Sequence, residues 1–159
     1  HRTAMLIYVI DAFNLIHSVP RLSESPTPRS DLLAFLKAER FEGSRANRLV
    51  VVFDGYPAEN ADHERLFEVI FSKNRTADDA IREYLEKSLH PKQVVVVSDD
   101  REVRDFARSF GARPMKNEEF LQRDAKHAKH ARRRAEGNEK KIEHAEEITE
   151  ELEKIWAGK

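Results

Sequence analysis

Four short apolar segments of this chain each lead into acidic residues. They are Ile7–Ile10 before Asp11, Val50–Phe53 before Asp54, Val69–Phe71 before Asp78 and Asp79, and Val94–Val97 before Asp99 and Asp100. Short runs rich in valine and isoleucine are typical of strands that are covered on both faces. The carboxyl ends of parallel strands share one edge of a sheet, where open α/β sheets place their ligands. The pattern therefore predicts a cluster of carboxylates at one sheet edge.

Helix signals alternate with these strands along the chain. One helix is expected from Ser30 and Asp31 onward, a second from Thr76, and a third that ends at Gly111, because each segment has an apolar stripe and suitable terminal residues. A short fifth strand is expected over 112–115. The alternation predicts an α/β fold of three layers, α/β/α, with a mostly parallel, Rossmann-like central sheet.

Two segments are harder to interpret. Residues 14–28 contain three prolines and several serines, so we expect a loop there with at most one helical turn. The third strand, over 66–71, follows a connection close to the shortest that a parallel crossover allows. Its direction relative to the other strands therefore stays open.

Length and composition exclude several classes of protein. The 159 residues suit one domain over 5–117 with a charged helical extension over 118–159, which Phe120 and Leu121 can anchor. Cysteine is absent, which excludes thiolate chemistry, and no apolar run approaches the about 18 residues of a membrane span. We therefore expect a cytoplasmic protein without membrane contacts. The net charge of −1 excludes a uniformly basic nucleic-acid binder.

Each acidic residue alone has an ordinary explanation. Asp78, Asp79, Asp99 and Asp100 fall in expected first turns of helices, where the helix dipole favours negative charge by about 0.3–1 kcal/mol. Several carboxylates at one edge repel one another unless protons, hydrogen bonds or a cation compensate. Mg²⁺ binds carboxylates and commonly meets phosphate groups, so phosphate chemistry is the leading hypothesis. Asn14 could orient a water or a phosphate oxygen, or only form a turn.

Four motifs in order resemble a known family. They are Ile10-Asp11-Ala12-Phe13-Asn14-Leu15-Ile16, Val51-Val52-Phe53-Asp54-Gly55, Val69-Ile70-Phe71-Ser72 with Thr76-Ala77-Asp78, and Val97-Ser98-Asp99. Together they resemble the NYN domain of bacterial YacP-like proteins, a group of PIN-like nucleases, over residues 6–119. The resemblance implies a PIN-like fold. One departure is Ala12, where the family usually has glycine, and its methyl group is expected to restrict backbone approach to the site.

The resemblance also implies an activity. It predicts a metal-dependent endoribonuclease that hydrolyses RNA phosphodiester bonds with Mg²⁺ or Mn²⁺. Its expected substrate is mRNA or rRNA, either on the ribosome, which would then be a partner, or in RNA processing. The residues that match the family's catalytic positions are Asp11, Asn14, Asp54, Asp78 and Asp99. On this interpretation Asp11 and Asp99 form the primary metal site. The other predicted metal ligands are Asp54, Asp78 and Asp100.

Basic residues supply candidate RNA contacts. Arg75 and Arg101 stand next to the acidic motifs and are candidates for holding the scissile phosphate, although both could equally pair with neighbouring acids. A basic segment would track the RNA backbone with little sequence preference; its residues are Lys126, Lys129, Arg132, Arg133 and Arg134. The alternative is a solvated helix with internal salt bridges. His127 and His130 lack a third ligand, so a zinc site is disfavoured.

Three other functions compete with a nuclease. A non-catalytic adaptor that binds RNA or the ribosome would keep the fold and lose the chemistry, which Ala12 and the basic segment allow. A receiver-like domain would accept a phosphoryl group on Asp54, with Lys116 after the fifth strand. A phosphatase with an Asp-x-Asp nucleophile is disfavoured, because Phe13 occupies the second acidic position.

Overall fold

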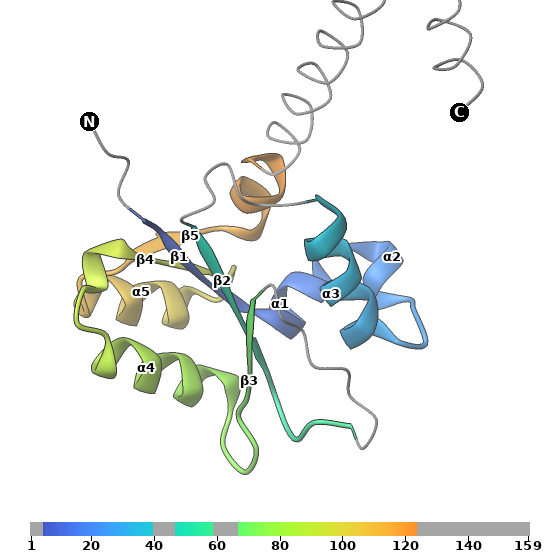
Figure 1. Ribbon diagram of the computed structural model, residues 1–159, viewed down its shortest axis with the longest axis horizontal. Coiled ribbons are helices and arrows are strands. Elements are labelled where there is room, and N and C mark those ends of the chain that lie inside the picture. The colour runs from blue at the N-terminus through green and yellow to red at the C-terminus, as the bar shows by residue number, and fades with distance from the viewer. Residues whose placement is uncertain (1–4, 40–46, 59–66, 124–159) are drawn as a thin grey trace, which may run out of the picture.

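A single parallel sheet forms the centre of the molecule (Figure 1). The computed structural model describes residues 5–39, 47–58 and 67–123. Within these residues the sheet has the strand order β3-β2-β1-β4-β5, and every pair of neighbours is parallel. The strands are β1 (Ile7–Asp11), β2 (Arg48–Phe53), β3 (Glu68–Phe71), β4 (Val94–Val97) and β5 (Arg113–Met115). The third strand, whose direction the sequence left open, is parallel.

Helices cover both faces of the sheet, which confirms the predicted three-layer α/β/α fold. One face carries α1 (Ala12–His17), α2 (Pro20–Ser23) and α3 (Pro28–Glu39). The other face carries α4 (Ala77–Lys87) and α5 (Arg101–Ser109), and the 3₁₀ turn η1 (Pro91–Gln93) leads into β4. A further helix begins at residue 117 and is described up to residue 123.

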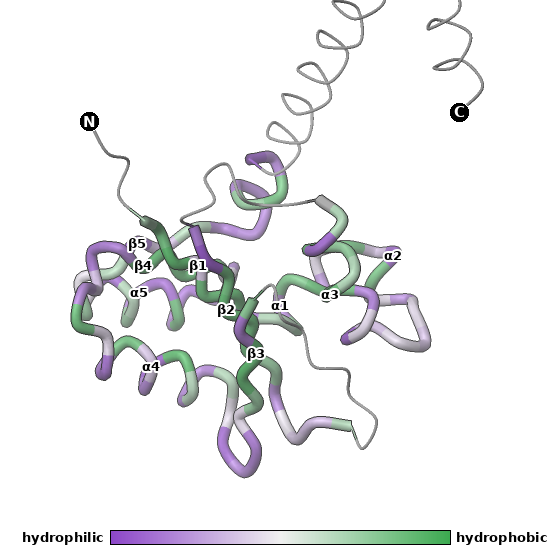
Figure 2. Tube along the Cα trace, viewed as in Figure 1, coloured by the Kyte–Doolittle hydropathy of each residue, from purple (hydrophilic) through white to green (hydrophobic). Residues whose placement is uncertain are grey.

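Each face of the sheet has its own hydrophobic core. Along β1, Tyr8 and Ile10 belong to the core under α1–α3, whereas Val9 belongs to the core under α4 and α5. This follows from the strand geometry, since successive side chains point to opposite faces. A strand with both faces covered needs apolar residues at every position. Figure 2 accordingly shows the central strands as mostly hydrophobic.

The expectation of a loop over 14–28 was wrong, because α1 and α2 lie there. Leu15 and Ile16 of α1 and Leu22 of α2 are buried in the core, so packing favours helical turns that the prolines did not suggest. Pro20 occupies the first turn of α2, where a missing backbone N–H has no cost. The same tolerance lets α3 begin at Pro28.

The helix that begins at residue 117 is attached to the first core. Phe120 is buried there and Leu121 packs against it, which confirms the predicted anchor. Residues 124–159 lie outside the described part of the chain, so the division into 5–117 and 118–159 stays a prediction. Among the described residues, no helix is both long and apolar enough to cross a bilayer.

Two leucine substitutions test whether α1 contributes to the core. Leu15→Ala should lower the free energy of unfolding by about 2–5 kcal/mol, because it leaves a cavity at a fully buried position. Leu89→Ala is the matched control, since Leu89 is 89% exposed and the change should stay within about 0.5 kcal/mol. Urea unfolding measures both. Equal effects of the two substitutions would contradict the placement of α1 in the core.

Candidate active site

The sheet has a topological switch point between β1 and β4. The chain passes from β1 to β2 on one side, whereas β4 lies on the other side of β1. In open α/β sheets, ligands bind at the carboxyl ends of the strands beside such a point. Asp11 is the last residue of β1, and Ser98 directly follows β4. The Ser98 hydroxyl donates a hydrogen bond of 2.9 Å to Asp11 Oδ2, so the two strand ends meet through these side chains.

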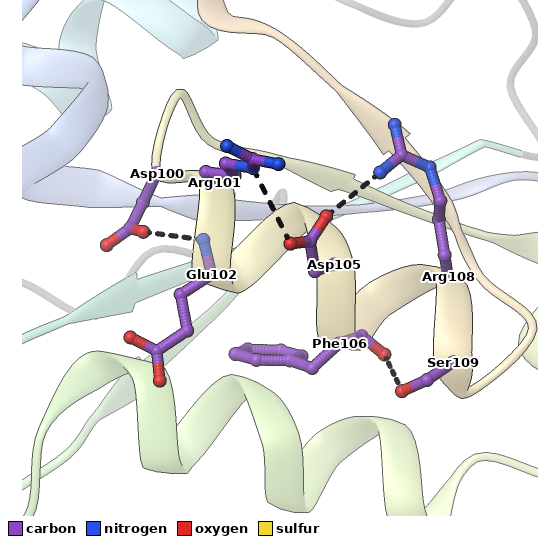
Figure 3. A network of polar contacts seen from close by, with 7 residues as sticks. All are labelled: Asp100, Arg101, Glu102, Asp105, Phe106, Arg108 and Ser109. Carbon is purple, nitrogen blue, oxygen red and sulfur yellow. Dashed lines mark hydrogen bonds and ion pairs between the residues drawn. The ribbon is translucent and has the colours of Figure 1, made fainter.

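Three other acids bind the N-termini of helices at this edge. Asp54 Oδ1 accepts a hydrogen bond of 2.7 Å from the backbone N–H of Ala77, the first residue of α4. Asp100 Oδ1 accepts one of 2.9 Å from the N–H of Glu102 in α5 (Figure 3). Asp99 Oδ1 accepts one of 2.9 Å from the N–H of residue 117. Helix N-termini stabilise negative charge, so each carboxylate is held by backbone donors.

Asp11 is in a different environment. Its side chain is buried, and burial raises the pKa of Asp11 to about 6. The negative charges of Asp78, Asp54 and Asp100 raise it further, while the Ser98 hydrogen bond opposes the change. Asp11 also precedes α1, but its side chain makes no capping hydrogen bond there.

Asp78 is coupled to the same group of acids. Burial raises the pKa of Asp78, and the carboxylates of Asp100, Glu102 and Asp54 add to the shift. Asp54 and Asp100 thus lie in electrostatic range of both Asp11 and Asp78, and we refer to Asp11, Asp54, Asp78 and Asp100 as the acidic cluster. Their roles as ligands or catalysts stay predictions.

The other two predicted site residues lie in a neighbouring polar network. Asn14 Oδ1 accepts hydrogen bonds of 2.8 Å from the backbone N–H of Asp99 and 2.8 Å from Nδ2 of Asn117. Nδ2 of Asn117 also contacts the Ser18 hydroxyl at 2.7 Å. We refer to Asn14, Ser18, Asp99 and Asn117 as the asparagine network. Asn14 and Asp99 are therefore joined to each other, beside the acidic cluster.

The acidic cluster has the right chemistry for a hard divalent cation. Carboxylate oxygens are the ligands that Mg²⁺ and Mn²⁺ prefer. Burial first, and the neighbouring carboxylates second, disfavour the ionised form of Asp11 and raise its pKa, so a bound cation would stabilise that form. In the part of the chain that the structure describes, however, no three His, Cys, Asp or Glu side chains lie close enough together to hold a metal ion. The donor set fits such an ion, while the described side chains are not gathered around one.

The two candidate phosphate-binding arginines pair with acids on the surface. Arg75 forms an ion pair with Glu83, and Arg101 Nε lies 3.9 Å from Asp105 Oδ2 (Figure 3). Both arginine side chains are exposed, so these pairs contribute little stability and open easily. The remaining predicted RNA contacts and both histidines lie outside the described residues; they are Lys126, His127, Lys129, His130, Arg132, Arg133 and Arg134.

Sequence reasoning missed Arg29, which fixes the loop after β2. Its guanidinium donates hydrogen bonds of 3.0 Å to the carbonyl of Asp54 and 2.8 Å to that of Tyr56. It also lies over three aromatic rings at 5.5–5.7 Å from their centroids, those of Phe13, Phe53 and Phe71. Gly55 between the two carbonyls has a φ of +87°, a conformation that glycine adopts without strain.

Ser98, Glu102 and Asn117 were also not identified as site residues. Ser98 stands inside a motif that was recognised, so its proximity to Asp99 was the available signal. Asn117 contacts Asn14, which lies 103 positions away in the sequence, and no local sequence pattern predicts such a contact.

Comparison with known proteins identifies the family of this chain. A family model described as the YacP-like NYN domain matches residues 8–157. The chain belongs to the YacP-like NYN domain family. It has the PIN-like nuclease fold that the sequence motifs implied, and this assignment replaces the receiver-like hypothesis for Asp54.

Two solved structures of a YacP protein are similar to this member of the family. A mutant of Rae1 (YacP) from Bacillus subtilis has a TM-score of 0.70 at 27% identity, covering 91% of this chain and 90% of that one. Rae1 (YacP) from the same organism has a TM-score of 0.66 at 27% identity, covering 97% and 96%. A search of curated proteins found no significant match. The similarity therefore extends over most of both chains.

The raised pKa of Asp11 makes stability depend on pH. The folded state binds this proton more tightly than the unfolded chain, whose reference value is 3.8, so the free energy of unfolding falls as the pH rises from about 4 to above 6. The Asp11→Asn substitution replaces the carboxyl group with an amide that does not ionise, so the variant should not lose this free energy of unfolding as the pH rises. Without divalent cations, the variant should be more stable than the native protein by about 1–3 kcal/mol at pH 7.5, with little difference at pH 4.

Urea unfolding at the two pH values measures this effect. Asp105→Asn serves as the control, since Asp105 is exposed and pairs only at the surface in the described structure; its effect should be small at both values. If Asp11→Asn were no more stable than the native protein at pH 7.5, Asp11 would not be a destabilising buried charge.

Proposed function

We propose that this protein is a metal-dependent endoribonuclease that hydrolyses RNA phosphodiester bonds at the acidic cluster. The observation that supports this most is Asp11: a carboxyl group buried at the switch point of a PIN-like fold, with three further acids in electrostatic range. Such an arrangement is unfavourable alone and becomes favourable with a cation. Perturbed groups of this kind concentrate at functional sites.

The protein's own residues hold and orient the reacting groups. Asp11 and Asp78 supply charge in a partly buried setting, while Asp54 and Asp100 stay anchored to α4 and α5 through one oxygen each. Asp99 remains a predicted ligand through Oδ2, since its Oδ1 binds the N–H of residue 117. When bound, Mg²⁺ or Mn²⁺ supplies an activated water and neutralises phosphate charge.

RNA must approach this negative edge with help from cations. Arg75 and Arg101 lie beside the cluster in sequence and can exchange their surface acids for phosphate oxygens. The predicted basic segment from Lys126 to Arg134 would add affinity that depends on salt. From the family resemblance, mRNA or rRNA on the ribosome is the proposed substrate, in the cytoplasm.

A non-catalytic RNA-binding adaptor is the second candidate. It is favoured by the absence, within the described residues, of three side chains close enough to hold a metal ion. Ala12 is compatible with either function, because it is fully buried among the apolar residues of the first core. An adaptor would bind RNA with equal affinity whether or not the acidic cluster is intact.

Cleavage of RNA by the purified protein decides between the two. In Mg²⁺ or Mn²⁺ we expect internal cleavage of a labelled single-stranded RNA, and chelation with EDTA should abolish it. Asp11→Asn and Asp78→Asn should each lower kcat/KM by about a hundredfold or more, because even the outer partners of metal ligands are worth about 10- to 100-fold. RNA binding should remain.

The matched control for this assay is Glu86→Gln, because Asp105 pairs with the proposed RNA contact Arg101. Glu86→Gln removes an exposed carboxylate of α4, so cleavage should stay within about twofold, as is usual for surface substitutions. Binding without cleavage by the native protein, in either metal, would favour the adaptor.

A further inference from the structure

We propose that Asn117 is a positioning residue that sets the orientation of the Asn14 amide at the active site. This inference rests on the proposed nuclease function, and it assigns a role to a residue outside the sequence motifs. Asn117 is fully buried at the start of the helix that follows β5. Its contacts point away from its own helix and toward the ends of β1 and β4.

The contacts of Asn117 reach α1 and the segment between β4 and α5. Nδ2 lies 2.8 Å from Asn14 Oδ1, 3.1 Å from the Asn14 carbonyl and 2.7 Å from the Ser18 hydroxyl. Its backbone N–H donates to Asp99 Oδ1. One residue therefore ties α1 to the segment between β4 and α5.

The amide of Asn14 is fixed by this arrangement. Its Oδ1 accepts from two donors at once, Nδ2 of Asn117 and the backbone N–H of Asp99. The amide group is planar, so fixing Oδ1 inside the network directs Nδ2 away from it. Asn14 can then present only N–H donors outward, and donors are what a phosphate oxygen requires.

A simple structural role does not explain the choice of asparagine. The Oδ1 atom of Asn117 is buried and has no hydrogen-bond partner among the described residues. A buried acceptor without a partner is unfavourable and calls for an explanation. Serine would also suit the start of a helix and would leave no such oxygen. The two N–H donors of the amide explain the side chain, because they contact Asn14 and Ser18.

The test combines kinetics with an observation of the Asn14 amide itself. Asn117→Ser keeps the backbone N–H that Asp99 accepts and removes the amide donors. We expect kcat for RNA cleavage to fall about tenfold while KM changes less than twofold. Glu119→Gln, an exposed substitution in the same helix, is the matched control and should change neither.

A double-mutant cycle shows whether Asn117 acts through Asn14. Asn14→Ala should lower kcat, and adding Asn117→Ser to it should cost little more, because residues that act as a unit are not additive. Fully additive losses would overturn the proposal. Asn117→Ala gives a second version of the cycle, and thermal unfolding confirms that each variant is folded at the assay temperature.

A readout that needs no cleavage separates this proposal from the proposed function. In ¹⁵N-labelled protein, the side-chain amide signals of Asn14, identified by their loss in Asn14→Ala, should shift in Asn117→Ser and stay in place in Glu119→Gln. If the native protein cleaves no RNA but the signals shift, the nuclease function fails and the positioning role stands. If the signals do not move, the positioning role is wrong whatever the activity.

Discussion

The site depends on one constraint: helices of a parallel sheet begin at the edge where the strands end. Each new helix exposes backbone N–H groups that need acceptors, and in this protein carboxylates supply them. Asp54 accepts a backbone hydrogen bond from α4, Asp100 accepts one from α5, and Asp99 accepts one from the helix that begins at residue 117. Completing the fold therefore already gathers negative charge at one edge. Acids of the proposed site therefore also have a structural role, because they bind the N-termini of helices next to the switch point.

Asp11 is the exception that gives this edge its chemistry. It is the most enclosed of the four acids in the cluster, and its neighbours are three carboxylates and one hydroxyl. Helix N–H groups bind Asp54 and Asp100, whereas Asp11 makes no capping bond with α1. The protein thus tolerates a group whose ionised form is disfavoured by burial. Local rules broken in this way are expected at functional positions, and a divalent cation would remove the conflict.

The sequence was sufficient for the strands and the acidic edge, but not for the contacts that orient the site. Apolar runs ending in acids revealed the layers, since the pattern reflects burial on both faces. Residues 14–28 were misjudged because their prolines outweighed Leu15 and Leu22, whose burial in the core decides the local structure. Arg29 and Asn117 were missed because their partners lie 25 to 103 positions away. Such contacts depend on how the helices and strands pack, so they cannot be predicted from the spacing of residues in the sequence.

Two consecutive acids show how the site divides into two parts. Asp100 caps α5, and its charge raises the pKa values of Asp11 and Asp78, so it belongs to the acidic cluster. Asp99 binds the N–H of residue 117 and donates its own N–H to Asn14, so it belongs to the asparagine network. The sequence pattern does not distinguish Asp99 from Asp100, yet their side chains accept hydrogen bonds from the N-termini of different helices. One part of the candidate site concentrates negative charge, and the other fixes a neutral amide beside it. Because Asp99 and Asp100 are adjacent in the chain, the short segment between β4 and α5 contributes to both parts of the site.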